Sequence, residues 1–251
     1  MQDMILRVTG MQKNYRHIRA LQGASLRVKK GGITAIVGDN GSGKSTLIKI
    51  LSGNIKPDGG TIEMDGQSYG SLSVKEAMRL GIRTVYQDLS LDNYKNSVEN
   101  IFLGAELMRG PFLDRRAMRE EAAAILQSIN VTVPDLDEPV RNLSGGQRQG
   151  VAIARALRTP GKLLLLDEPT AAMGIQESHS ALNILRGLRE KGMSQLIISH
   201  NIHQVFDIAD YVYVMRSGRC IAGVSTADTT PQQLQELILR RENQEVRYES
   251  V

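Results

Sequence analysis

The sequence predicts an α/β fold with a mostly parallel sheet, and two observations lead to this prediction. Apolar runs of strand length recur at 33–37, 163–166 and within 194–201. Amphipathic helical stretches lie between these runs. Because parallel strands require long crossover connections, buried strands that alternate with helices indicate a parallel sheet.

The N-terminal part has a different pattern. Residues 4–8 and 24–28 alternate apolar and polar side chains, which predicts half-buried strands joined by turns. The turn signals Pro-Asp-Gly-Gly and Asp-Gly within 55–66 surround a short strand and predict a hairpin. A helix follows the glycines at 38–43, and we expect it to end at Gly53.

The middle of the chain is expected to be helical. From 97 to about 158 strand signal is weak, and apolar residues recur at helical spacing over 114–129, with Asp114 as the expected N-cap. Strand signal returns after Pro160, and we expect a further helix to be closed by Gly192. The helical segment is therefore interpreted as an insertion into the α/β pattern and not as a separate domain.

We expect one domain over the whole chain, 1–251. Its expected parts are a core with a β subdomain at about 1–90 and 160–225, a helical subdomain at about 91–159, and a C-terminal helix and tail at about 226–251. The polar residues 240–251 are expected to fray.

Composition and charge predict a soluble protein of the cytoplasm. Of 251 residues, 41% are hydrophobic and 23% are charged, and the basic residues behind the net charge of +4 are spread along the chain. Such dispersed charge is weak support for nucleic-acid binding. No apolar run reaches the roughly 20 residues of a membrane span, and we expect no signal peptide. The single cysteine, Cys220, lies in an apolar run, where we expect it to be packed and unreactive.

The residues 37–46, VGDNGSGKST, are called here the glycine loop. Their spacing matches G-x-x-x-x-G-K-[ST], with a strand before and a helix after. Glycine lets main-chain N–H groups approach an anion without a Cβ in the way, and the following helix presents its positive end to phosphate. Lys44 is expected to reach the β- and γ-phosphates of a nucleotide, and the hydroxyl of Ser45 to bind Mg²⁺. The flanking strand and helix disfavour the alternative of a glycine-rich turn with no ligand.

The residues of this loop that are predicted to bind the nucleotide are Gly38, Asp39, Asn40, Gly41, Ser42, Gly43, Lys44, Ser45 and Thr46.

Two carboxylates follow the apolar run at 163–166. Open α/β sheets bind ligands at the carboxyl ends of their strands, and Asp167 and Glu168 stand at such an end. Asp167 is expected to bind Mg²⁺ directly or through water, and Glu168 to polarise the attacking water. Alone, the pair would equally fit the start of a helix before Pro169. Together with the glycine loop, it is interpreted as catalytic.

A second glycine pair opens a helix within 142–157, NLSGGQRQGVAIARAL. Ser144 is expected to be the N-cap of this helix. The residues Ser144, Gly145, Gly146 and Gln147, called here the signature segment, then form a second helix N-terminus suited to an anion. A chain that already has one phosphate site needs a separate explanation for this one.

These elements, in this order, resemble the motifs of the ABC transporter ATPases, and the resemblance covers nearly the whole chain. It implies a P-loop NTPase of the ABC cassette type, with a RecA-like mostly parallel sheet core, an N-terminal antiparallel β subdomain and an inserted α-helical subdomain. By the same resemblance, Tyr15 stacks on the adenine of ATP, Gln87 contacts Mg²⁺ and the attacking water, and His200 contacts the γ-phosphate. Each of these three residues alone is weak support, because such side chains are often structural.

The resemblance also implies the partners. In the family, two cassettes pair head to tail, so that the signature segment of one closes over the ATP of the other. A homodimer is therefore expected, bound to membrane permease subunits on the cytoplasmic face of the membrane. The segments 85–104 and 143–157 look most like those of bacterial ribose and fructose importers, which implies an indirect link to a sugar-binding protein. We expect residues 89–94, called here the docking segment, to stay partly exposed at the rim of the groove that receives the permease.

This chain departs from the family pattern at Gly174, where the family usually has an aspartate that helps to link the two ATP sites of the dimer. Related ATPases of other functions fit less well. DNA-repair and chromosome-organising ATPases separate the glycine loop from the signature segment by coiled coils or zinc modules, which are missing here. Translation-regulating cassette proteins carry two cassettes in one chain. An ATPase subunit of an exporter or amino-acid importer remains the open alternative, and no nucleic-acid partner is expected.

Overall fold

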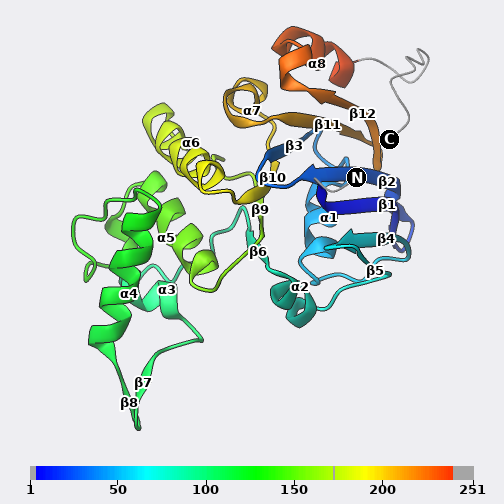
Figure 1. The fold of residues 1–251 in the computed structure, drawn as a ribbon. Coiled ribbons are helices and arrows are strands. Elements are labelled where there is room, and N and C mark those ends of the chain that lie inside the picture. Colours follow the sequence, from blue (N-terminus) through cyan, green and yellow to red (C-terminus); the bar gives the residue numbers. More distant parts are fainter. Residues whose placement is uncertain (1–3, 172, 240–251) are drawn as a thin grey trace. The chain divides into compact units, whose positions relative to one another are not determined.

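The computed structural model describes residues 4–171 and 173–239. Its internal contacts divide the chain into two compact units, which are described separately (Figure 1). The first, here called the sheet unit, comprises Met1–Thr84, Gly161–Glu168 and Arg189–Val251. The second, here called the helical unit, comprises Val85–Pro160 and Pro169–Leu188.

Six strands form the main sheet, in the order β12-β11-β3-β10-β9-β6. β3 pairs in parallel with β10 and β11, β10 pairs in parallel with β9, and β12 runs antiparallel to β11. Every residue of β3, β9 and β10 is buried, so the predicted parallel core is confirmed. The strands of this sheet are β3 (Ile33–Val37), β6 (Ile82–Val85), β9 (Leu163–Asp167), β10 (Ser194–Ile198), β11 (Tyr211–Arg216) and β12 (Arg219–Ser225).

Four antiparallel strands form a second sheet, in the order β2-β1-β4-β5, which confirms the predicted N-terminal β subdomain. The predicted hairpin joins β4 to β5 through Asp65 and Gly66. Their φ angles of 52° and 76° are those of the tight turn for which Asp-Gly is the preferred sequence. The strands are β1 (Met4–Tyr15), β2 (Ile18–Lys29), β4 (Gly59–Met64) and β5 (Gln67–Tyr69).

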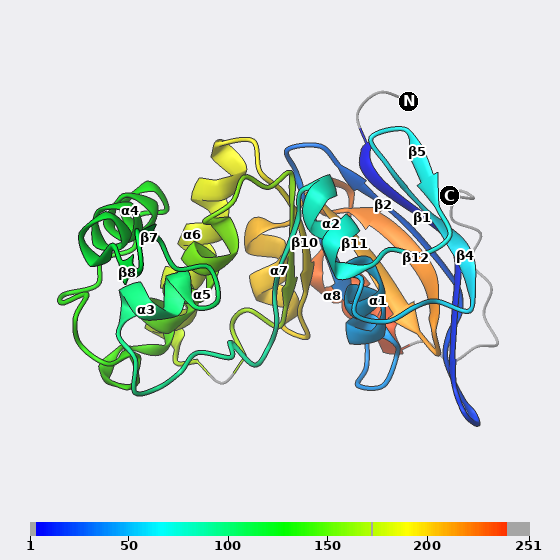
Figure 2. The ribbon, with the colours of Figure 1, turned by 90° about the horizontal axis from the view of Figure 1, so that it is seen from below.

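Helix α1 (Lys44–Leu51) contacts β2 of one sheet and β9 of the other, so it is packed between the two sheets (Figure 2). It ends at the expected place, before Gly53 with a φ of 79°. On the other face of the main sheet, α7 (Ile202–Ile208) contacts β3 and α8 (Pro231–Leu239) contacts β11 (Figure 1). Helix α2 (Val74–Leu80) was not predicted from the sequence, although Ser73 and Glu76 form a capping box at its start.

Helices α3, α4 and α5 of the helical unit contact one another, and their buried side chains include Phe102, Met118 and Ile153. Asp114 caps α4 as predicted, since its carboxylate accepts the Ala117 N–H at 3.0 Å. A short hairpin of β7 and β8 was not predicted from the sequence. The elements of this unit are α3 (Ser97–Phe102), β7 (Met108–Arg109), β8 (Phe112–Leu113), α4 (Arg115–Ser128), α5 (Gly145–Leu157) and α6 (Ile175–Glu190), whose last two residues belong to the sheet unit.

The helical unit does not coincide with the expected segment 91–159. It begins earlier, at Val85, and takes in 169–188. At the start of α6, the Glu177 carboxylate accepts the main-chain N–H of Gly145 in α5. The two compact units are a division by contacts and are not the same as the subdomains expected from the sequence. The expected limits of those subdomains therefore stay a prediction. The residues 240–251, which were expected to fray, lie outside the described residues. Among the helices described in 4–171 and 173–239, we find none that is long and apolar enough to cross a membrane.

Candidate nucleotide-binding site

The glycine loop lies between β3 and α1 and has a backbone that requires glycine. Gly38 and Gly43 have φ angles of 147° and 104°, which side-chain-bearing residues rarely adopt. A Cβ on Gly38 would lie 2.0 Å from the main-chain oxygen of Met215. A Cβ on Gly43 would lie 2.4 Å from the main-chain oxygen of Ala20. The loop is therefore folded tightly against neighbouring strands.

The Lys44 ammonium is held inside this loop. Its Nζ donates to the main-chain oxygens of Gly38 at 2.7 Å and Asp39 at 2.9 Å. Burial lowers the pKa of Lys44, and the nearby carboxylates of Glu168 and Asp167 partly offset this effect. A buried ammonium of this kind gains stabilisation from an anion that enters the loop.

The first turn of α1 completes the anion site. Gly43 is the N-cap of this helix, and it provides no side-chain hydrogen bond to the main-chain N–H groups of the first turn. These groups, together with the positive end of the helix, favour a bound anion. The glycine conformations, the buried Lys44 and the start of α1 together fit the phosphates of ATP.

Asp167 and Ser45 form a cluster of oxygen atoms next to the loop. Asp167 is the last residue of β9, and its Oδ1 accepts a hydrogen bond from Ser45 Oγ at 3.2 Å. The side chain of Asp167 is buried, and burial raises its pKa, so its charged form gains from a nearby cation. Carboxylate and hydroxyl oxygens are ligands that suit Mg²⁺.

Glu168 and His200 come together from the ends of two neighbouring strands. The main-chain N–H of Glu168 donates to the oxygen of Ile198 at 3.0 Å, and Glu168 has a φ of 54°, which is uncommon for a residue other than glycine. His200 Nδ1 lies 2.5 Å from Glu168 Oε2. The alternative that Asp167 and Glu168 begin a helix is wrong, because the next helix begins only at Ile175.

The signature segment lies in the helical unit and has the capping geometry that was predicted. The Ser144 hydroxyl accepts the Gln147 N–H at 3.3 Å, and the Gln147 side chain accepts the Ser144 N–H at 2.9 Å. These two bonds are a capping box at the start of α5. Ser144 is exposed, so its hydroxyl is accessible on the surface of this unit.

Two other predicted site residues lie at exposed positions. Tyr15 is the last residue of β1 in the sheet unit and is 40% exposed, with Lys13 Nζ 5.6 Å from its ring centroid. Gln87 is exposed in the helical unit. The structure thus brings together Lys44, Ser45, Asp167, Glu168 and His200 in the sheet unit. The roles of these residues, like those of Tyr15 and Gln87, stay predictions.

Two side chains that organise the helical unit, those of Glu177 and Arg155, were not predicted from the sequence. Glu177 accepts hydrogen bonds at the starts of both α5 and α6. Arg155 donates to the main-chain oxygens of Leu89 and Ser90. Glu177 had a local signal, because a glutamate at the third position of a helix is half of a capping box. Arg155 had no such signal.

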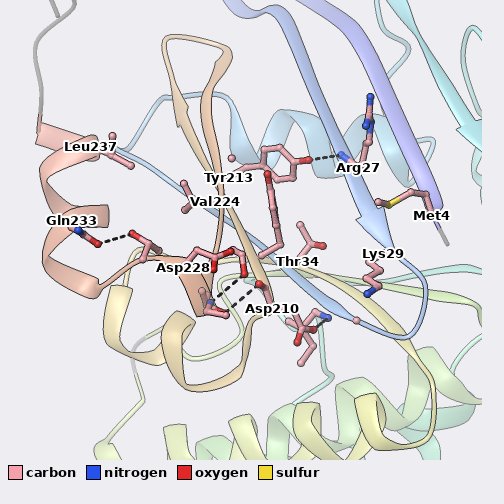
Figure 3. Close-up of a pocket in the computed structure, with 18 of the residues that line it drawn as sticks. Met4, Arg27, Lys29, Thr34, Asp210, Tyr213, Val224, Asp228, Gln233 and Leu237 are labelled. Carbon is pink, nitrogen blue, oxygen red and sulfur yellow. Dashed lines mark hydrogen bonds between the residues drawn. The ribbon is translucent and has the colours of Figure 1, made fainter. Parts of the chain in front are cut away.

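A cavity of about 980 Å³ lies at the opposite ends of the parallel strands from the glycine loop (Figure 3). Among its lining residues, the Tyr213 hydroxyl accepts the main-chain N–H of Arg27 at 3.0 Å. The Asp210 carboxylate accepts the Ile33 N–H at 2.8 Å and pairs with Arg189. Since the glycine loop follows the other end of β3, this cavity is separate from the nucleotide site.

Comparison with protein families gives a match to the family described as ABC transporter, over residues 21–171. The chain is 41% identical to the xylose/arabinose import ATP-binding protein of Sulfolobus acidocaldarius over 234 residues, which cover 93% of each chain. It is 39% identical to the fructose import ATP-binding protein of Rhizobium meliloti over 237 residues, 91% of each. It is also 39% identical to a ribose import ATP-binding protein of Burkholderia cenocepacia, of which it spans only 47%.

Solved structures with the same fold are ATP-binding cassettes. One is a cassette of an ABC transporter in its ADP conformation, 30% identical, with a TM-score of 0.79 over 94% of each chain. Another is a dimeric post-hydrolysis cassette bound to ADP and phosphate, 25% identical, with a TM-score of 0.75 over 88% of this chain and 98% of the other. The chain therefore belongs to the ABC transporter family and is one of its ATP-binding cassettes.

Proposed function

We propose that this cassette hydrolyses ATP to energise a sugar importer and that it works as a dimer on the cytoplasmic face of the membrane. The observation that carries the proposal is the cluster of Lys44, Asp167, Glu168 and His200 beside the glycine loop. The likeness to xylose/arabinose and fructose import proteins over nearly the whole chain supports a sugar as the cargo.

In this proposal, the glycine loop and Lys44 bind the β- and γ-phosphates, and Tyr15 stacks on the adenine ring. Mg²⁺ would be held by Ser45, Asp167 and Gln87, and when bound it would neutralise charge on the phosphate oxygens. The buried carboxylate of Asp167, with its raised pKa, supports this choice of ligand.

Glu168 is proposed to accept a proton from the water that attacks the γ-phosphate. His200 would orient this carboxylate through the contact at Nδ1 and present its other ring nitrogen toward the γ-phosphate. The unusual φ of Glu168 supports a functional role, because strained backbone tends to be retained at catalytic positions.

A second cassette is proposed to complete each site. The signature segment of one subunit would close over the ATP that the glycine loop of the other subunit holds, and hydrolysis would release the pair. The fold is shared with a dimeric cassette bound to ADP and phosphate, which supports a dimer as the working form. Permease subunits, and through them a sugar-binding protein, would be the remaining partners.

The shared site is tested with Ser144→Arg. We expect this variant to bind ATP as the wild type does but to lose ATP-driven dimerisation by at least about tenfold, because a long cation replaces a capping hydroxyl at the signature segment. Mixed with Lys44→Ala, it should dimerise again, since one glycine loop and one signature segment remain intact across the pair. Sedimentation with ATP and Mg²⁺ measures both results.

The matched control is Ser128→Arg, which adds the same side chain at an exposed position of α4. If the wild type dimerises with ATP while the mixture of Ser144→Arg and Lys44→Ala never does, the proposal that each ATP site is shared between two subunits is wrong.

The docking segment is proposed to contact the permease. Tyr94 is 79% exposed and Leu91 is half-buried, as expected from the sequence, whereas Ile101 and Phe102 are buried within the unit. Arg155 of α5 bonds to the segment's main chain and fixes its position.

Cysteines at Leu91 and Tyr94 are therefore expected to crosslink to the permease in membranes. The background variant replaces Cys220, whose burial raises the pKa of its thiol to about 11 and makes it a poor nucleophile. Phe112→Cys, at a position 75% exposed on the β7-β8 hairpin, is the control. A complex that transports sugar and crosslinks only through the control position would place the docking site elsewhere.

A further inference from the structure

One carboxylate, that of Glu177, joins the starts of two helices in the helical unit. Its Oε1 accepts the main-chain N–H of Gly145, the first residue of α5, at 2.7 Å. Its Oε2 accepts the main-chain N–H of Gly174 at 3.1 Å. Gly174 is the N-cap of α6, because its carbonyl oxygen accepts the Ser178 N–H at 2.9 Å. Glu177 thus bonds to the N-terminus of its own helix, α6, and to that of α5, which begins in the signature segment.

The position of Glu177 complements the capping box of α5. Within that box, the N–H groups of Ser144 and Gln147 bond to each other's side chains. The Gly145 N–H lies between them in the sequence, and Glu177 is its acceptor. The negative charge also lies at the positive ends of two helix dipoles, where a carboxylate is stabilising. The start of α5 therefore depends on a residue of α6 as well as on its own cap.

The glycines of the signature segment allow this close contact. A Cβ on Gly145 would lie 3.0 Å from Glu177 Oε2, and a Cβ on Gly146 would lie 3.2 Å from the Glu177 main-chain oxygen. Both distances are tighter than ordinary van der Waals contact. A side chain at either glycine would therefore crowd the first turn of α6, independently of any phosphate.

The same bond bears on the departure at Gly174. Glycine has no side chain to cap α6, and the Glu177 carboxylate bonds to its N–H in place of a reciprocal capping pair. An aspartate at this position would put a second negative charge next to that carboxylate, which is unfavourable. In this chain, the link between the signature segment and the start of α6 is therefore made by Glu177.

We propose that Glu177 is a positioning residue for the shared ATP site: it holds the signature segment in register with the start of α6, so that the segment meets the nucleotide of the other subunit in one orientation. This inference rests on the proposed function, because it concerns the dimer in which the signature segment acts. In this proposal Glu177 acts through the signature segment, by its bond to the main-chain N–H of Gly145.

Glu177→Gln is the test, because it keeps the shape of the side chain but replaces one accepting oxygen by an NH₂ group. That group cannot accept the main-chain N–H of Gly145 or Gly174, so one of the two hydrogen bonds is lost. We expect ATP binding by the monomer to stay within about twofold of wild type, and the ATP concentration needed for dimerisation to rise about tenfold. Glu190→Gln removes the same charge from an exposed position at the other end of α6 and should behave as wild type.

A mixing experiment separates positioning from simple destabilisation. Glu177→Ala mixed with an excess of Lys44→Ala should form heterodimers, because the one usable glycine loop faces an intact signature segment. Wild type mixed with an excess of the double variant Lys44→Ala and Glu177→Ala should form far fewer, because its ATP faces the altered segment. If Glu177→Ala only destabilised its own chain, the first mixture should form fewer heterodimers than the second. In the first mixture the destabilised chain is the limiting partner, whereas in the second it is present in excess.

The outcomes distinguish this inference from the proposed function. If the wild type fails to dimerise with ATP, both the proposed dimer and the role of Glu177 in it are wrong. A wild type that dimerises, with Glu177→Gln dimerising at the same ATP concentration, overturns the role of Glu177 alone. Thermal unfolding of Glu177→Gln is measured alongside, so that a folded variant with a dimerisation defect supports the proposal.

Discussion

Glu168→Gln is expected to slow ATP turnover by a factor of about 10² to 10⁴, with little change in ATP affinity. The amide has nearly the size of the carboxylate and leaves the glycine loop intact, but it cannot accept a proton from the attacking water. The backbone of Glu168 is held by its hydrogen bond to Ile198, so the new side chain should occupy the same place beside His200. Turnover is measured as phosphate release, and affinity by titration with ATP and Mg²⁺.

The same variant should accumulate as an ATP-bound dimer, since the step that releases the pair is blocked. Sedimentation with ATP and Mg²⁺ reports this directly. Glu121→Gln removes a carboxylate from α4, which contributes no residue to the proposed site, and should turn over ATP normally. A Glu168→Gln protein that hydrolyses ATP at the wild-type rate and stays monomeric would remove Glu168 from the catalytic role.

Lys44→Ala is expected to weaken ATP binding by about a hundredfold or more, because the triphosphate loses its main cation and the charge-assisted hydrogen bonds of the ammonium. Lys49→Ala is the matched control, since this lysine lies on the exposed side of the same helix. Calorimetric titration with ATP in the presence of Mg²⁺ compares the two. Affinity near that of wild type in Lys44→Ala would contradict the assignment of the glycine loop.

The loss of affinity in Lys44→Ala should not reflect a loss of folding. Burial lowers the pKa of Lys44, so the charged ammonium is less favourable in the folded chain than in water. Below the lowered pKa, removal of this charge relieves its desolvation cost and thereby offsets the loss of the hydrogen bonds to Gly38 and Asp39. We therefore expect only a small change in the free energy of unfolding of the nucleotide-free protein. Thermal unfolding without nucleotide measures this.

Local patterns account for the parts of the site that the sequence predicted. The glycine loop, the end of β9 and the cap at Ser144 are each specified by a few adjacent residues, and the structure places them as expected. Side-chain bonds between distant segments have no such signal. Arg155 bonds to main-chain oxygen atoms more than sixty residues away. Every residue has such an oxygen, so the sequence does not indicate which residues accept these bonds. The β7-β8 hairpin was missed because two-residue strands have no readable periodicity.

The bonds from Arg155 to the docking segment have a consequence for how such a cassette diverges. They end on the main-chain oxygens of Leu89 and Ser90 and not on their side chains. Substitutions at Leu89, Ser90 or Leu91 therefore leave the attachment to α5 in place. In the proposed function, side chains of the docking segment can therefore change to suit a different membrane partner without loss of these two bonds to α5.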